Sequence, residues 1–298
     1  MAIIDDIKRS YSQGSMLLKL IFINIGVFLL LHLAVIIAML FNAGGDLLQW
    51  VELPSDLWML LRRPWTVVTY MFVHYGLLHI LFNMLWLYWL GRIFMEFFTS
   101  KQLTALYLLG GLGGALFFLL AYNLLPYFSG RQAFLMGASA SVIAIVVATA
   151  VYRPDYKIGL LFLGEVSIKW VAIVTVAISL IGIEESNAGG NIAHIGGAVV
   201  GAWFALRIKM GRDITRPLNN AIDAFVGLFN GRSWKWPTFK RPVRKVANNE
   251  MRQSARQHDT VSEEELDRIL GKIKAAGYDA LSDEEKDKLF KASRRREP

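Results

Sequence analysis

Six apolar stretches, separated by short polar connections, dominate the first two thirds of the chain. The longest runs from Leu20 to Phe41, and the others cover about 77–97, 102–124, 137–152, 169–183 and 190–208. At about 1.5 Å per residue, a helix as long as the first stretch crosses a hydrocarbon core of about 30 Å. The shorter stretches can also span a membrane when they are buried among other helices. The pattern predicts an all-α membrane protein with a bundle of six transmembrane helices.

The pattern changes after residue 212. A mildly amphipathic stretch, Pro217 to Leu228, is followed by tryptophans interleaved with lysines and arginines in 234–245. Aromatic and basic residues beside a last span are typical of a segment on a lipid surface. The chain therefore divides into a transmembrane domain (1–212), a juxtamembrane segment with a polar linker (213–260) and a C-terminal part (261–298).

Two capping boxes predict two short helices in the C-terminal part. Ser262 with Glu265, and Ser282 with Glu285, place a hydroxyl and a carboxylate three residues apart. This spacing satisfies the free amides at a helix N-terminus. Gly277 is suited to end the first helix. We expect a small cytoplasmic helical hairpin.

The composition supports a membrane protein. Hydrophobic residues make up 54% of the chain, against about 45–50% in soluble domains, and the mean hydropathy is +0.40. The absence of cysteine excludes disulfides, thiolate metal sites and a cysteine nucleophile. The formal net charge of +8 follows from basic residues that flank apolar stretches, so nucleic acid is not an expected partner.

Lysines and arginines in the short connections set the expected orientation. One side of the membrane would hold Lys8, Arg9, Lys19, Arg92, Lys101, Arg153, Lys157, Lys169, Arg207, Lys209, Arg212 and Arg216. The opposite side would hold only Arg62, Arg63 and Arg131. This bias places both termini in the cytoplasm, and an even number of crossings agrees with termini on the same side. The long outer connection, about 43–76, fits either an interfacial helix or a loop with aromatic belt residues.

Polar side chains from three of the six stretches fall at one level of the membrane. His79 and Asn83 lie one helical turn apart near the outer end of the second stretch. Ser139 and His194 lie near the outer ends of the fourth and sixth. Polar and ionisable groups inside spans are costly, so their coincidence in depth indicates a functional site.

Ser139 and His194 have neighbours that suit a hydrolytic site. Ser139 follows Gly137 at a loop-to-helix junction, where a substrate backbone can approach and free amides can stabilise an oxyanion. His194 is followed on its own face by Gly197 and Gly201, which allow close packing of helices. If the fourth stretch is the neighbour, the imidazole reaches the serine hydroxyl and can act as its general base.

The second stretch offers further donors, but no carboxylate clearly completes a triad. His79 and Asn83 can donate hydrogen bonds to an oxyanion. Glu96 lies at the cytoplasmic end of its stretch, and Glu184 and Glu185 lie in a loop on the correct side. A Ser–His dyad is the economical interpretation, and a triad stays open.

These residues resemble the motifs of the rhomboid family. The similar segments are Pro64-Trp65 and Thr69 to His74, His74-x4-His79-x3-Asn83, Gly137-x-Ser139 and Ala193-His194-x2-Gly197-x3-Gly201. They occur in the family's order within roughly residues 16–208. The resemblance implies an intramembrane serine endopeptidase in which Ser139 is the nucleophile, His194 the base, and His79 and Asn83 part of the oxyanion hole.

The resemblance also implies partners and a location. Substrates would be single-pass membrane proteins, cut in or near their transmembrane segment and typically beside a small residue. Membrane lipid is the other expected partner, and no metal or other cofactor is expected. We expect a multi-pass protein of the cell's inner (plasma) membrane, with the active site toward the extracytoplasmic side. The oligomeric state is not predicted.

The chain departs from the family pattern at two positions. Ala140 stands where the family often has glycine, and Ile143 stands where it often has an aromatic residue that packs on the histidine. We therefore expect a less firmly held imidazole and a lower activity. Ser141 lies about 200° around the helix from Ser139, which makes it the weaker candidate for the nucleophile.

Three other functions fit parts of the pattern. A rhomboid-like pseudoprotease would bind transmembrane segments without cleaving them, but both Ser139 and His194 are present. A transporter or channel is disfavoured because no inverted repeat is apparent and the polar residues cluster at one level. A zinc intramembrane protease is disfavoured because the sequence has no H-E-x-x-H motif.

Overall fold

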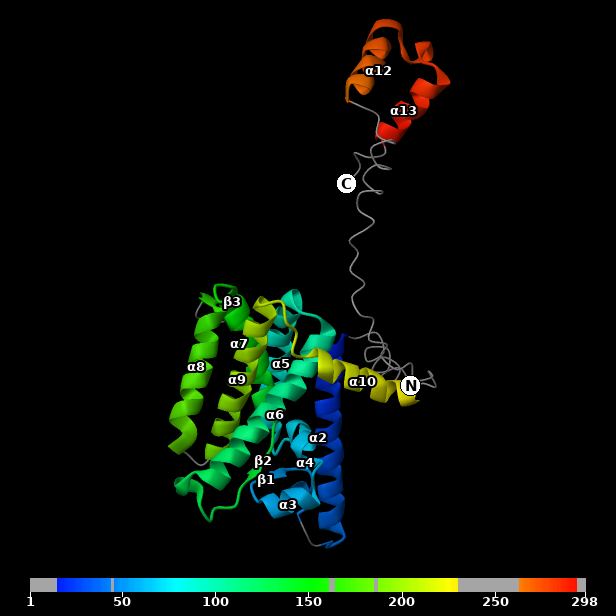
Figure 1. Cartoon of the computed structure of the whole chain (residues 1–298). Helices are drawn as coiled ribbons and strands as arrows, with labels where there is room; N and C mark the ends of the chain where they lie inside the picture. The colour runs from blue at the N-terminus through cyan, green and yellow to red at the C-terminus, as the bar shows by residue number, and fades with distance from the viewer. Residues whose placement is uncertain (1–14, 44–45, 161–163, 185–186, 230–262, 294–298) are drawn as a thin grey trace, which may run out of the picture. The chain divides into compact units, whose positions relative to one another are not determined.

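A computed structural model describes residues 15–43, 46–160, 164–184, 187–229 and 263–293. The chain divides into two compact units, Met1–Trp234 and Lys235–Pro298. The first unit contains the long apolar helices, and the second contains a short helical hairpin (Figure 1).

The long helices of the first unit coincide with the six predicted stretches to within a few residues. They are α2 (Met16–Leu40), α5 (Leu77–Phe97), α6 (Ser100–Leu124), α7 (Ser139–Tyr152), α8 (Ile168–Ile181) and α9 (Ala188–Lys209). Among the described residues, α2, α5, α6 and α9 are long and apolar enough to cross a membrane, and α7 and α8 are shorter apolar helices. The prediction of a mostly helical membrane bundle is confirmed.

Helix α7 forms the centre of the bundle. Every residue from Ala140 to Ala150 is buried, which agrees with a helix that is apolar on all sides. It packs against α6, α9, α5 and α8, and Figure 1 shows α8 and α2 at opposite edges of the bundle. Helix α2 exposes large apolar side chains such as Leu30 and Met39, a surface suited to lipid rather than to water.

The long connection between α2 and α5 is a compact layer of short elements. These are the 3₁₀ turn η1 (Leu48–Trp50), strand β1 (Leu53–Pro54), α3 (Leu57–Arg62), α4 (Thr66–Thr69) and the 3₁₀ turn η2 (Tyr70–Phe72). Asp56 caps α3 by accepting a hydrogen bond from the Met59 amide at 2.6 Å. Trp58 on α3 is 75% exposed, as expected of an interfacial helix, and α3 is six residues long.

Two small antiparallel sheets correct the prediction of an all-α fold. Strand β1 pairs with β2 (Phe134–Leu135), which precedes the α7 helix. Strands β3 (Lys157–Leu160) and β4 (Gly164–Ser167) pair between α7 and α8. Strands of two to four residues are too short for a period-two pattern to mark them.

Helix α10 (Arg216–Phe229) follows α9 and is tied to the start of α6. Gln102 donates to the Asp213 carboxylate at 3.0 Å, and Lys101 pairs with Asp223 at 2.6 Å. In Figure 1, α10 runs across the direction of α2 instead of continuing the bundle. This placement suits a helix that lies along a membrane surface.

The second unit is a hairpin of α12 (Glu263–Ala276), the 3₁₀ turn η5 (Tyr278–Ala280) and α13 (Asp283–Ser293). Gly277 ends α12 with a φ of +84°, where glycine is favoured. Ser262, predicted to cap α12, lies outside the described residues.

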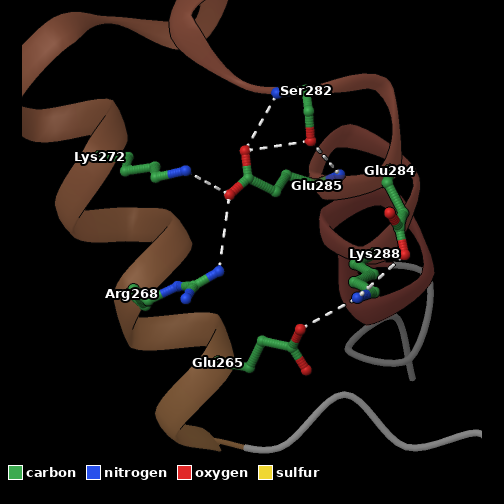
Figure 2. Close-up of polar contacts among 7 residues, drawn as sticks. All are labelled: Glu265, Arg268, Lys272, Ser282, Glu284, Glu285 and Lys288. Carbon is green, nitrogen blue, oxygen red and sulfur yellow. Dashed lines mark hydrogen bonds and ion pairs between the residues drawn. The ribbon is translucent and has the colours of Figure 1, made fainter.

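Glu285 is the polar centre of the hairpin (Figure 2). Its carboxylate accepts hydrogen bonds from Lys272 at 2.6 Å and from the Ser282 amide at 3.0 Å. The Glu285 amide in turn donates to the Ser282 hydroxyl at 3.3 Å, so this predicted capping box is confirmed. The Lys272 ammonium, followed by the Ser282 amide, lowers the pKa of Glu285 to about 2.

Candidate active site

Ser139 is the first residue of α7, and two hydrogen bonds hold the turn before it. Gly137 has a φ of +115°, a conformation that side chains rarely adopt. Its amide donates to the Tyr70 carbonyl at 2.9 Å, and the Ala138 amide donates to His74 Nε2 at 3.4 Å. The chain before the serine is therefore positioned by the segment that leads into α5.

His74 can accept this bond because it is neutral. It is 1% exposed, and its Nδ1–H can donate to the Phe72 carbonyl at 3.3 Å, which leaves Nε2 as the acceptor. Burial, and next the neighbouring His79, lower the pKa of His74 to about 4. The neutral form that the Ala138 contact requires is therefore present at physiological pH.

His194 on α9 faces the serine. Its Nε2 lies 2.7 Å from Ser139 Oγ, across 55 residues of sequence. Glycines make this approach possible, because a Cβ at Gly197 would overlap the Ala140 carbonyl oxygen and a Cβ at Gly201 would overlap that of Ala144. The absence of side chains at both positions lets α9 lie directly against α7.

His79 and Asn83 on α5 reach the same place. A Cβ built on Gly137 would lie 2.9 Å from His79 Nε2 and 3.9 Å from Ser139 Oγ, so the imidazole stands beside the nucleophile's turn. Asn83 Nδ2 donates to the His79 carbonyl at 2.9 Å, which leaves its second hydrogen for another acceptor. The structure thus brings together all four polar residues that the sequence singled out.

Two cavities meet at these residues. One, of about 420 Å³, is lined by His79, Asn83, Ser139 and His194 together with backbone near the β2 strand. The other, of about 550 Å³, is mostly apolar and lies among α5, α7, α8 and α9. Asn83, Ser139 and His194 line both cavities, so the serine stands where the two cavities join.

Other polar residues discussed above lie elsewhere. Ser141 is fully buried, and its hydroxyl has no hydrogen-bond partner among the described residues. Glu96 accepts a hydrogen bond from the Tyr156 hydroxyl at 2.8 Å near the opposite end of α5. Across the part of the chain that the structure describes, no group of three histidine or carboxylate side chains could hold a metal ion.

Sequence reasoning missed Ser179. This α8 residue is 3% exposed, lines the apolar cavity, and places its Oγ 3.0 Å from His194 Nδ1. In the sequence it is a single serine in an apolar helix, which is most simply explained by a bond to its own helix.

Comparison with known proteins adds to this geometry. Residues 61–210, half of the chain, match the Rhomboid domain family. The chain belongs to the rhomboid family. With its several apolar helices, it is a multi-pass membrane member of that family. Residues 255–295, which include the C-terminal hairpin, match DUF6576, a family of unknown function.

Individual rhomboid relatives are distant. RHOMBOID-like protein 12, mitochondrial, of Arabidopsis thaliana is 33% identical over 161 residues, which are 50% of this chain and 48% of that protein. Rhomboid protease GlpG of Yersinia pseudotuberculosis is 27% identical over 59% of each chain. Presenilin-associated rhomboid-like protein A, mitochondrial, of Danio rerio is 27% identical over 45% of this chain and 34% of its own. The chain thus covers less than two thirds of these relatives.

Proposed function

We propose that this rhomboid is an active intramembrane serine endopeptidase. The observation that carries the proposal is the 2.7 Å contact between His194 Nε2 and Ser139 Oγ where two cavities share their lining residues. A serine hydroxyl is inert without a base, and this contact supplies one. One relative, GlpG of Yersinia pseudotuberculosis, is named a protease, which supports the same activity here.

The reaction follows from the positions of the side chains. Ser139 Oγ attacks the scissile carbonyl carbon while its proton passes to His194 Nε2. The resulting oxyanion accepts hydrogen bonds from the Ser139 amide, a free amide of the first turn of α7, and from His79 and Asn83. His194 then gives the proton to the leaving amine, and a water molecule, deprotonated by the same imidazole, hydrolyses the acyl-enzyme.

The apolar cavity favours transmembrane segments as substrates. Its walls come from Phe82 and Trp86 on α5, from Val142 and Val146 on α7, and from several residues of α8. Such a lining binds apolar side chains, whereas a soluble peptide would keep its polar groups in water. We propose single-pass membrane proteins as the substrates, cut in or near their membrane segment.

The proposed topology has six spans and cytoplasmic termini. Helices α5, α7 and α9 carry His79, Ser139 and His194 near their N-terminal ends, so these ends face the same, extracytoplasmic, side. The short helix α7 is enclosed by the bundle, which permits a span below the usual length. Helix α10 and the hairpin are cytoplasmic, with α10 on the lipid surface, and the membrane is the inner (plasma) membrane.

A fluorophosphonate tests the proposal directly. This reagent forms a covalent bond with a serine that is activated by a base, so the wild-type protein in detergent is expected to be labelled. Ser139→Ala is expected to remove the label. Ser141→Ala is the matched control, because its hydroxyl is buried on the same helix and has no partner among the residues that the structure describes. It is expected to keep full labelling.

Two results would count against this assignment. Labelling that is retained in Ser139→Ala but lost in Ser141→Ala would assign the nucleophile to Ser141. A folded wild-type protein that is not labelled in detergent or in liposomes would instead favour a rhomboid-like pseudoprotease that binds transmembrane segments without cleaving them.

The apolar cavity has its own test at Val146. This residue lies two turns along α7 from the nucleophile and faces the cavity. Val146→Phe fills part of that space, so cleavage of a single-pass reporter is expected to fall by about tenfold or more while fluorophosphonate labelling is retained. Val199→Phe, on the exposed face of α9, is the control. Cleavage of the reporter at the wild-type rate in Val146→Phe would show that the cavity does not receive the substrate segment.

A further inference from the structure

We propose that Ser179 is a positioning residue that holds His194 in the tautomer needed to accept the Ser139 proton. The inference rests on the proposed function and adds a third residue to that site. Three helices are involved, because Ser139 lies on α7, His194 on α9 and Ser179 on α8. His194 stands between the two hydroxyls, with Nε2 2.7 Å from Ser139 Oγ and Nδ1 3.0 Å from Ser179 Oγ.

The direction of each hydrogen bond follows from counting protons. Ser179 Oγ also lies 3.0 Å from the Thr175 carbonyl oxygen, and a carbonyl oxygen only accepts. The single hydroxyl proton of Ser179 therefore goes to Thr175, so Ser179 Oγ must accept from His194. The neutral imidazole then carries its proton on Nδ1 and leaves the Nε2 lone pair free for the proton of Ser139.

A bond from Ser179 to its own helix does not by itself explain this arrangement. Serines in membrane helices commonly bond the carbonyl four residues earlier, as Thr175 does with Val171 at 2.7 Å. That habit accounts for the Ser179–Thr175 bond but not for an imidazole nitrogen 3.0 Å away on another helix. At Ser179 the same bond orients an acceptor toward His194, which is the task that a carboxylate performs in a Ser-His-Asp triad.

The surroundings leave this orientation to Ser179. Ile143 lines the cavity beside His194 and offers the imidazole no hydrogen bond. Asn191 on α9 donates to the Gly182 carbonyl, just after α8, at 2.6 Å. This contact joins the two helices near their outer ends and keeps Ser179 level with the imidazole. Among the described residues, Ser179 is thus the hydrogen-bond partner of His194 Nδ1.

Inactivation kinetics with the fluorophosphonate test the inference without a known substrate. Ser179→Ala is expected to lower the rate constant of inactivation by about 10- to 100-fold and to leave the reagent's apparent binding constant unchanged. Ser179→Thr keeps a hydroxyl that can make both bonds and is expected to restore most of the rate. Thr149→Val is the control, because it removes a buried hydroxyl that donates a hydrogen bond within its own helix, to the Ile145 carbonyl.

The tautomer supplies a second readout that does not depend on activity. Because the chain has only five histidines, ¹⁵N spectra of histidine-labelled protein in liposomes can be assigned by comparison with His194→Gln. Wild type is expected to show His194 protonated at Nδ1 near neutral pH, and Ser179→Ala is expected to show a mixture of both tautomers. Ser179→Thr should match wild type.

These outcomes separate the inference from the proposed function. If wild type is not labelled at Ser139, the proposed function fails, and the spectra still decide the role of Ser179. A wild-type His194 protonated at Nε2 would overturn the inference, as would Ser179→Ala with an unchanged inactivation rate and an unchanged tautomer. A rate loss that Ser179→Thr does not restore and that Thr149→Val shares would reduce Ser179 to a packing residue.

Discussion

Alanine at Ser139 or at His194 is expected to reduce cleavage of a single-pass reporter by about 10⁴-fold or more. Alanine at both positions is expected to cost no more than either change alone. The reason is the 2.7 Å contact between the two side chains. A serine without its base does not attack, and a base without its serine has no proton to take, so the two residues act as one unit.

The measurement is the cleavage rate of the four proteins reconstituted in liposomes, with thermal unfolding of each as the folding control. Losses that multiply in the double variant would show that the residues act independently and would contradict the proposed dyad. Cleavage that persists in Ser139→Ala would place the nucleophile elsewhere. Neither result is expected from the observed geometry.

Much of the fold could be predicted because a membrane constrains the sequence strongly. Each apolar stretch had to satisfy its own backbone, and helices are the main way to do so in lipid. The sequence therefore located α2, α5, α6, α7, α8 and α9 closely. Strands β1 and β2 were not predicted. Their pairing joins Leu53 to Leu135, and a contact between residues so far apart leaves no local sequence pattern.

In the candidate site, too, some residues could be predicted from the sequence and one could not. Ser139 and His194 could be found because glycines at fixed spacings, Gly137 before one and Gly197 after the other, reveal close backbone contacts. Ser179 could not be found, because its partner belongs to another helix and its own sequence is that of an ordinary apolar span. The role of such a serine can be recognised only when the orientation of α8 relative to α9 is known.

The mildest possible change at Gly197 is expected to disable the site. Gly197→Ala adds one methyl group, which would overlap the Ala140 carbonyl oxygen of α7. A backbone oxygen cannot avoid the overlap by changing rotamer, as a side chain can, so α9 must move away from α7. His194 lies one turn earlier on the same helix, and a displacement of about 1 Å at a reacting group costs about 100-fold in rate. Overpacking is also expected to lower the unfolding temperature by about 5 °C.

Fluorophosphonate labelling and thermal unfolding measure these two effects. Gly26→Ala on α2 is the control, because a Cβ there meets no described atom within 4 Å and alanine favours the helix. It is expected to keep full labelling without loss of stability. If Gly197→Ala were labelled at the wild-type rate, close packing of α7 and α9 could not be what brings His194 to Ser139.

A substitution at a second glycine, Gly201, distinguishes an effect on stability from an effect on the distance between His194 and Ser139. Gly201 meets the Ala144 carbonyl oxygen in the same way as Gly197 meets that of Ala140, but it lies one turn farther from His194. Gly201→Ala is therefore expected to lower the unfolding temperature about as much as Gly197→Ala and to slow labelling less. Equal losses of labelling would mean that α9 shifts as a rigid body. A smaller loss in Gly201→Ala would mean that α9 tilts, and that the contact at Gly197 sets the distance between imidazole and hydroxyl.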